Sequence, residues 1–278
     1  MTAVKVACAQ LAPVVGDRAG NRDRARAALR DAVGAGARLV VLPELCTSGY
    51  VFGSLEEARS LAQPPEGGAL DDWAQEAGRG EAVVVGGFCE LAAGGVLHNS
   101  AAVVDGTGVR AVYRKAHLWD GEQRFFAAGA AAPPVVETAI GRVGVAVCYD
   151  MSFPEPARDM AMRGADVIAV PANNPVGSRP SGQEPVEVVA MRAHAYFNRV
   201  FVACCDRCGS ERGVEFLGAS VITDEQGWAL TPPALGAPSL LLADVVMSRA
   251  RDKRWNARND VFGDRRPSLY TADPGSMV

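Results

Sequence analysis

Short apolar runs rich in valine alternate with amphipathic stretches along most of the chain. Runs of this length that are apolar at nearly every position are typical of strands buried on both faces. We predict such strands at 4–10, 37–43, 83–89, 143–147, 166–171, 200–205, 216–223 and 240–245. A hairpin is predicted from 96 to 113, because Asp105-Gly106 is a turn sequence between two apolar segments.

The amphipathic stretches predict helices at 21–33, 55–62, 70–78, 155–163 and 187–199. Asn21 is a residue type that caps helices, and we expect it to begin the first of them. The repeated order of strand and helix predicts an α/β fold. In such folds ligands bind outside the carboxyl ends of the strands, so residues at those ends are the first candidates for chemistry.

Composition and charge narrow the class of protein. The chain has 278 residues, of which 49% are hydrophobic and 22% charged, and no internal linker is visible. The net charge of -4, without a basic stripe, argues against nucleic-acid binding. No apolar run is long enough to cross a membrane, and the amino terminus lacks the features of a signal peptide. We therefore expect a soluble, cytoplasmic protein.

Cysteine usage agrees with that expectation. Seven cysteines without an export signal indicate reduced thiols rather than a disulfide framework. Cys205 and Cys208 have the spacing of a C-x-x-C pair, but no second pair or nearby histidine follows. A zinc site is therefore disfavoured, and so is a redox site, because the pair does not open a thioredoxin-like helix. The end of a packed strand is the simpler interpretation.

Cys148 lies where a buried strand gives way to a helix that begins near Pro154. A side chain at such an elbow is exposed at the edge of a sheet, near the free backbone N–H groups of the next turn. The thiol could therefore be a nucleophile beside an oxyanion site. Taken alone, the segment favours the alternative that Cys148 is a small core residue, because free cysteines are usually buried.

Two other polar residues follow apolar strands in the same way. Glu44 follows the second predicted strand, and Lys115 follows the hairpin, so both could meet Cys148 at one sheet edge. A buried carboxylate can act as the base for a thiol, and a lysine can stabilise an oxyanion. A Cys-His enzyme is less favoured, because His117 is better placed to brace the loop around Lys115 than to take a proton.

Three segments, in this order, resemble the signatures of the nitrilase superfamily of carbon–nitrogen hydrolases. They are Leu42-Pro43-Glu44-Leu45, Tyr113-Arg114-Lys115-Ala116-His117-Leu118 and Val147-Cys148-Tyr149-Asp150-Met151-Ser152-Phe153-Pro154-Glu155. The resemblance covers most of the chain to about residue 227, and it extends to Ala9-Gln10, His98-Asn99-Ser100-Ala101, Gly121-Glu122, Phe126-Ala127-Ala128-Gly129 and Arg192-Ala193.

The resemblance implies a single domain over residues 1–278 with a four-layer α-β-β-α sandwich and neither a cofactor nor a metal. It also implies that Glu44 is the general base, that Lys115 stabilises the tetrahedral intermediate, and that Cys148 forms a thioester. A second glutamate that orients the substrate in relatives corresponds to Glu122. By the same resemblance, the backbone N–H of Tyr149 joins Lys115 in holding the oxyanion.

The residues after the cysteine favour an amide over a nitrile. Nitrilases proper usually have Cys-Trp-Glu, whereas this chain has Cys148-Tyr149-Asp150, as many amidases of the superfamily do. Asn174 stands where many relatives have tryptophan, which would widen or polarise one wall of the pocket. We expect Tyr50, Tyr149, Asn173 and Asn174 to contact the substrate, and charges between Arg179 and Glu184 could bind a polar substrate tail.

The sequence thus predicts a hydrolase that converts a small primary aliphatic amide to a carboxylic acid and ammonia. N-carbamoyl hydrolysis is the main alternative, while a nitrilase or a non-catalytic binding module is less favoured. The predicted partners are the amide, water and further copies of the chain, in a homodimer or a higher homo-oligomer, with no nucleic acid or membrane. The charged tail at 250–278 could contribute to a homodimer.

Overall fold

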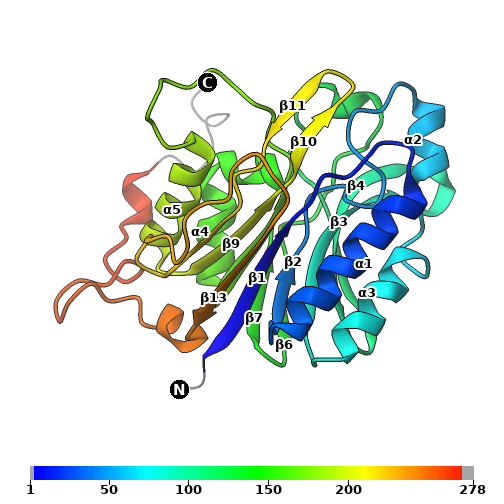
Figure 1. The fold of residues 1–278 in the computed structure, drawn as a ribbon. Coiled ribbons are helices and arrows are strands. Elements are labelled where there is room, and N and C mark those ends of the chain that lie inside the picture. The colour runs from blue at the N-terminus through cyan, green and yellow to red at the C-terminus, as the bar shows by residue number, and fades with distance from the viewer. Residues whose placement is uncertain (1–2, 271–278) are drawn as a thin grey trace.

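Two β-sheets form the centre of the structure, a computed structural model that describes residues 3–270 (Figure 1). The first sheet has the order β13-β1-β2-β3-β4-β5. Its strands are β1 (Val4–Gln10), β2 (Leu39–Val41), β3 (Val83–Leu91), β4 (Leu97–Asp105), β5 (Gly108–Arg114) and β13 (Ser239–Val245). The second has the order β12-β9-β8-β7-β6. Its strands are β6 (Val135–Thr138), β7 (Gly141–Val145), β8 (Val167–Ala172), β9 (Phe201–Asp206) and β12 (Val221–Thr223).

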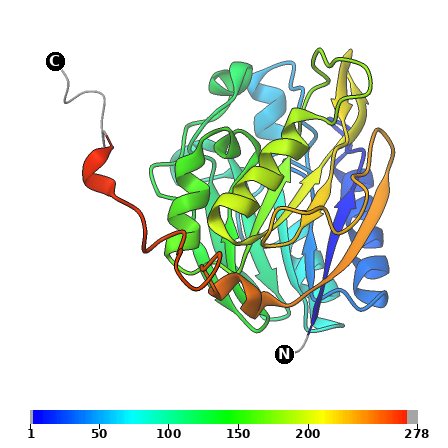
Figure 2. The ribbon, with the colours of Figure 1, turned by 90° about the vertical axis from the view of Figure 1, so that its left-hand side faces the viewer.

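Helices cover the outer faces of both sheets. They are α1 (Arg18–Gly34), α2 (Leu55–Leu61), α3 (Ala69–Gly78), α4 (Pro154–Met162) and α5 (Val186–Asn198). The helices α1 and α3 lie on the first sheet, and α4 and α5 lie on the second (Figures 1 and 2). Short 3-10 turns occur at η1 (Ala93–Gly95), η2 (Asp120–Arg124), η3 (Cys148–Ser152), η4 (Met247–Arg251) and η5 (Pro267–Leu269).

Side chains on the two faces of each strand enter different cores. In β1, Val6 and Cys8 pack in the core between the two sheets, whereas Ala7 and Ala9 pack in the core shared with α1 and α3. Because both faces of such a strand are buried, it is apolar at successive positions, which is the pattern seen in the sequence. The predicted α-β-β-α sandwich is confirmed.

The predicted start of the first helix is wrong. Helix α1 begins at Arg18, and its N-cap is Asp17, whose carboxylate accepts a hydrogen bond from the N–H of Gly20. Asn21 lies inside the helix and is buried, and its side-chain amide bonds both the N–H and the C=O of Val14. Asn21 therefore stabilises the preceding loop, a role that local sequence does not distinguish from capping.

The predicted strand at 216–223 is in fact two strands. β11 (Val214–Leu217) pairs with β10 (Cys208–Glu211) in a small separate ladder, whereas β12 joins the second sheet. The break lies at Gly218, which has a φ of +60° and no room for a side chain, since a Cβ would lie 2.8 Å from the Cβ of Cys208. Neither β6 nor β10 was predicted, because both are short and only partly apolar.

After β13 the chain passes through η4 and then leaves the body of the sandwich as an arm that reaches residue 270 (Figure 2). Part of the predicted tail, residues 271–278, lies outside the described residues. Within residues 3–270, none of the helices combines the length and the apolar character needed to cross a bilayer.

Candidate active site

Glu44 is fully buried just beyond the end of β2. The backbone around it is tied to β3, because Gly87 donates to the C=O of Pro43 at 3.0 Å and accepts from the N–H of Cys46 at 3.0 Å. Close approach requires glycine at position 87, since a Cβ there would lie 2.5 Å from the Cα of Glu44. The sheet therefore sets the position of the Glu44 carboxylate.

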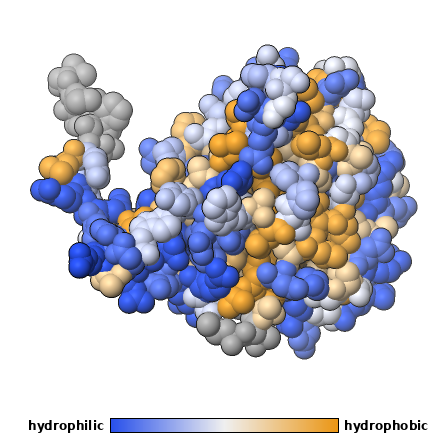
Figure 3. Space-filling view, turned by 60° about the vertical axis from the view of Figure 1, so that its left-hand side comes forward, coloured by the Kyte–Doolittle hydropathy of each residue, from blue (hydrophilic) through white to orange (hydrophobic). Residues whose placement is uncertain are grey.

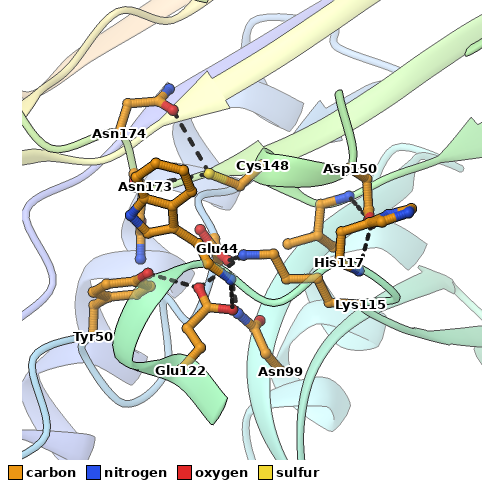
Figure 4. A network of polar contacts seen from close by, with 12 residues as sticks. Glu44, Tyr50, Asn99, Lys115, His117, Glu122, Cys148, Asp150, Asn173 and Asn174 are labelled. Carbon is orange, nitrogen blue, oxygen red and sulfur yellow. Dashed lines mark hydrogen bonds and ion pairs between the residues drawn. The ribbon is translucent and has the colours of Figure 1, made fainter. Parts of the chain in front are cut away.

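The two oxygens of Glu44 have different surroundings (Figure 4). Oε1 accepts hydrogen bonds from Lys115 Nζ at 2.8 Å and from Asn99 Nδ2 at 2.7 Å. Oε2 is buried and has no hydrogen-bond partner among residues 3–270. Burial raises the pKa of Glu44 to about 7, against the opposing effect of the Lys115 charge. Glu44 thus has one anchored oxygen and one oxygen that can accept a proton near neutral pH.

Lys115 follows β5 and is buried between two carboxylates. Its ammonium group lies 2.8 Å from Glu44 Oε1 and 2.8 Å from Glu122 Oε1. Burial by itself lowers the pKa of Lys115, but the neighbouring acidic groups, Glu44 first among them, outweigh it, and the pKa is raised. Lys115 is therefore a fixed positive charge in the centre of the site.

Glu122 lies in η2 and orients both Lys115 and Tyr50 (Figure 4). The phenol of Tyr50 donates to Glu122 Oε1 at 2.6 Å, and the N–H of Trp119 donates to Oε2 at 3.2 Å. Burial, together with the nearby negative charges, raises the pKa of Tyr50, so its phenol remains a neutral donor. A pocket of about 210 Å³ is lined by Tyr50 and Glu122, among others.

Cys148 begins η3 with a φ of +45°, a conformation that is strained for a residue with a side chain. Asp150 holds this elbow, since its Oδ2 accepts from the N–H of Val147 at 2.9 Å and from the hydroxyl of Tyr113 at 3.0 Å. Its Oδ1 lies 2.7 Å from Nδ1 of His117. The predicted bracing of the loop by His117 is confirmed, and the elbow geometry is fixed from three directions.

The thiol of Cys148 is partly buried and packs against the cores on both sides of the second sheet. It donates to Asn174 Oδ1 at 3.6 Å and to the C=O of Asn173 at 3.9 Å. Burial raises its pKa well above the ordinary range, and the charge of Glu44 adds to this effect. A thiol in this state needs a base before it can act as a nucleophile.

The residues expected to contact substrate surround this group. Tyr50 donates a hydrogen bond to Glu122, and Asn174 accepts one from Cys148, as described above. The amide of Asn173 is buried, and neither its oxygen nor its nitrogen has a partner among the described residues, which is unusual for a buried polar group. The ring of Tyr149 packs edge-on against Trp119, with centroids 4.8 Å apart.

A model of the carbon–nitrogen hydrolase family matches residues 5–254. The chain belongs to this family. A protein of Pyrococcus abyssi named nitrilase is 37% identical over 268 residues, which cover 96% of this chain and 99% of that protein. An (R)-stereoselective amidase of a Pseudomonas species is 34% identical over 82% of this chain and 80% of its own. An N-carbamoylputrescine amidase of Arabidopsis thaliana is 30% identical over 87% of this chain and 86% of its own.

Solved structures show the same fold. The NitN amidase of Nesterenkonia sp. AN1 superposes with a TM-score of 0.78 and 27% identity, covering 96% of this chain and 98% of its own. In a mutant of that amidase, the acetamide moiety of fluoroacetamide is covalently added at the active-site cysteine. This carbon–nitrogen hydrolase is therefore similar to amidases of the nitrilase superfamily, as its sequence predicted.

Asn99 is a residue of the site for which the sequence predicted no role. It lies in β4, in a row of buried residues, and its amide nitrogen bonds Glu44. The available signal was a polar residue in the middle of a strand otherwise buried on both faces, since such a residue needs a partner there. Its partner, Glu44, lies 55 residues away along the chain, beyond the end of β2, so only the tertiary structure shows the pairing.

Asp206 and Arg207, at the end of β9, support the site from two sides. Asp206 accepts from the N–H of Asn174 at 2.9 Å. Arg207 is buried and pairs with Glu211 at 3.1 Å, and Glu211 in turn accepts from the N–H of Tyr50 at 2.8 Å. These side chains position the residues that contact Cys148 and Glu122, which no local pattern in the sequence indicated.

The alternative of a Cys-His enzyme has no support in the geometry. Nδ1 of His98 lies 2.7 Å from the C=O of Ala127, Nε2 of His194 lies 2.7 Å from the C=O of Met151, and His117 bonds Asp150. Cys205 and Cys208 are both free and buried, at the end of β9 and the start of β10. Among residues 3–270, no three His, Cys, Asp or Glu side chains gather in a way that could hold a metal.

Proposed function

We propose that this carbon–nitrogen hydrolase converts a small primary aliphatic amide to a carboxylic acid and ammonia through a thioester on Cys148. The observation that supports it best is the asymmetry of Glu44, with Oε1 held by Lys115 and Asn99 and Oε2 without a partner. A carboxylate held in this way can take a proton on one oxygen without losing its position.

In the proposed first half-reaction, Glu44 Oε2 takes the thiol proton while the sulfur of Cys148 bonds to the amide carbon. The carbonyl oxygen becomes an oxyanion, which is held by the ammonium of Lys115 and the backbone N–H of Tyr149. Glu44 then gives its proton to the amide nitrogen. The C–N bond breaks, ammonia leaves, and the acyl group remains on sulfur as a thioester.

In the second half-reaction, Glu44 takes a proton from water, and the resulting hydroxide adds to the thioester carbon. The tetrahedral intermediate is held by the same two donors. When the C–S bond breaks, the sulfur regains the proton from Glu44 and the carboxylic acid is released. Because the raised pKa of Lys115 keeps it a positive charge, Glu44 is the group that moves protons in both halves of this proposal, and no cofactor takes part in either.

The test is ammonia release from a panel of aliphatic amides by the wild-type protein and by Cys148→Ala. We expect turnover in the wild type and none in the variant. Cys46→Ala is the control, since Cys46 is a buried free cysteine whose side chain packs in the core shared with α1 and α3. Full activity of Cys148→Ala, with the fold verified by circular dichroism, would refute the thioester mechanism.

N-carbamoyl hydrolysis is the second candidate, and it is supported by the similarity to an N-carbamoylputrescine amidase. The same machinery would then act on a ureido carbon and release carbon dioxide and an amine together with ammonia. Adding N-carbamoyl amines and nitriles to the panel distinguishes these activities from amide hydrolysis. A folded protein that releases ammonia from no member of the panel would instead be a binding module.

We also propose that the protein is a cytoplasmic homodimer. Apolar side chains gather on the face that carries α4 and α5 (Figure 3). Phe197 in α5 is 57% exposed, and Trp228, which lines a pocket together with Phe197, is 62% exposed. Monomers seldom expose large apolar patches, and two-fold dimers are the commonest assemblies. The arm up to residue 270 could reach a second copy (Figure 2). Light scattering, which measures the molar mass in solution, tests the homodimer on the wild type and on Trp228→Glu. A monomeric wild type would contradict the proposed homodimer.

A further inference from the structure

A pocket of about 320 Å³ is lined by Cys148, and neither Glu44 nor Lys115 is among its lining residues. Its walls come from η3, β8 and the first turns of α5. Most of the lining is aliphatic or thioether in character, from Met151, Val170, Ala172, Ala190 and Met191. Since a water occupies about 30 Å³ in the liquid, the pocket holds roughly ten atoms of that size. A small acyl chain attached to the sulfur of Cys148 fits there.

Glu187 is the one charged residue among those that line this pocket, and its other polar lining residues, Ser152 and Asn174, are neutral. Glu187 is partly buried in the first turn of α5, and its carboxylate has no hydrogen bond or ion pair with any other residue in the described range 3–270. The neighbouring Glu184, by contrast, pairs with Arg192 at 2.8 Å. A first-turn acid stabilises a helix to a small extent wherever it points. That effect does not explain a carboxylate placed without a partner in a pocket beside the nucleophile.

We propose that the substrate is a primary amide whose short alkyl chain ends in a cation, an amine or a guanidine, and that Glu187 binds that cation. This inference rests on the proposed function, because it takes the acyl chain of the Cys148 thioester as the occupant of the pocket. Aliphatic walls suit the methylene groups, and the lone carboxylate suits the terminal charge.

The charges of the reaction centre favour the same class. Glu44 and Glu122 bring two carboxylates to the single ammonium of Lys115, so the ionised group has a net negative charge. A cationic substrate is attracted to such a site, and an anionic one is repelled. Arg179, in the loop before α5, lines a second pocket of about 540 Å³ and not the one that Cys148 lines.

The test compares three amides of matched length: hexanamide, δ-aminovaleramide and glutaramate, with neutral, cationic and anionic ends. We expect kcat/KM of the wild type to favour the cationic amide over the neutral one by about tenfold or more, as for a hydrogen bond to a charged group. Glu187→Gln should abolish that preference by raising KM for δ-aminovaleramide much more than KM for hexanamide. Glu155→Gln, an exposed first-turn acid of α4, is the matched control.

The outcomes separate this inference from the function on which it rests. If the wild type prefers hexanamide or glutaramate, or if Glu187→Gln retains the cationic preference, the role of Glu187 is wrong while amide hydrolysis stands. If none of the three amides is hydrolysed by the folded protein, the proposed function fails and this inference fails with it. Loss of the preference in Glu155→Gln would also overturn the assignment, because Glu155 does not line the pocket.

Discussion

Replacement of Asn99 by leucine should move the pH dependence of the reaction upward. Asn99 donates to Glu44 Oε1 at 2.7 Å, and this bond favours the ionised carboxylate. A hydrogen bond to a charged group is worth about 1.5–3 kcal/mol. Since one pKa unit corresponds to about 1.4 kcal/mol, its loss should raise the pKa of Glu44 by roughly one to two units.

The direction in which Asn99→Leu changes activity follows from the proposed role of Glu44 as the base. Glu44 must be deprotonated to take the thiol proton, so kcat/KM should rise with pH through the pKa of Glu44, which is about 7. One pH unit below that pKa, the wild type should retain about a tenth of its maximum. Asn99→Leu should retain about a hundredth or less there, and it should recover most of its activity at higher pH.

The assay is kcat/KM for one amide from pH 5 to pH 10, with the fold of each protein verified by thermal unfolding. Gln75→Leu is the control, because it removes an exposed side-chain amide of α3 that lies outside the site. An acid limb at the same pH in Asn99→Leu and in the wild type would refute the reasoning. Either Glu44 would not be the titrating base, or its bond to Asn99 would not influence it.

Three further substitutions test the site. Lys115→Met should lower kcat by about a hundredfold to a thousandfold through the loss of an oxyanion donor, and a change in KM alone would contradict that role. Glu211→Gln should lower the free energy of unfolding by about 3 kcal/mol, measured in urea, because a buried arginine loses its partner; an unchanged midpoint would contradict this. Gly87→Ala should displace Glu44 and lower kcat, whereas Gly34→Ala, whose added methyl meets nothing within 4 Å, should not; equal activities would show that the close approach at Gly87 is unimportant.

The layers of the fold could be predicted because the residue pattern of each strand indicates whether its two faces are buried. A strand between two covered faces is apolar at successive positions, so the runs at 4–10 and 83–89 were visible without any tertiary information. The ends of helices and strands could not be predicted where they depend on residues far away in the sequence. The break at Gly218 reflects the approach of Cys208, and the start of α1 reflects the use of Asn21 by the preceding loop.

The candidate site divides in a similar way. Glu44, Lys115 and Cys148 each follow an apolar segment, and this position with the family resemblance was enough to make them candidates. The residues that position them, Asn99, Asp206 and Glu211, were not predicted from the sequence. They reach Glu44, Asn174 and Tyr50 only after strands far apart in sequence have paired.

The sequence by itself therefore determined the family and the sandwich and singled out Glu44, Lys115 and Cys148 as candidates for the chemistry, since buried strands and signature segments are local patterns. Tertiary structure alone decided which oxygen of Glu44 lacks a partner, how far burial shifts its pKa, and that Glu187 faces the pocket beside Cys148. The physical reason is that hydrogen-bond partners, desolvation and cavity walls are set by side chains from several segments at once. The distances between these side chains cannot be read from the sequence of any single segment.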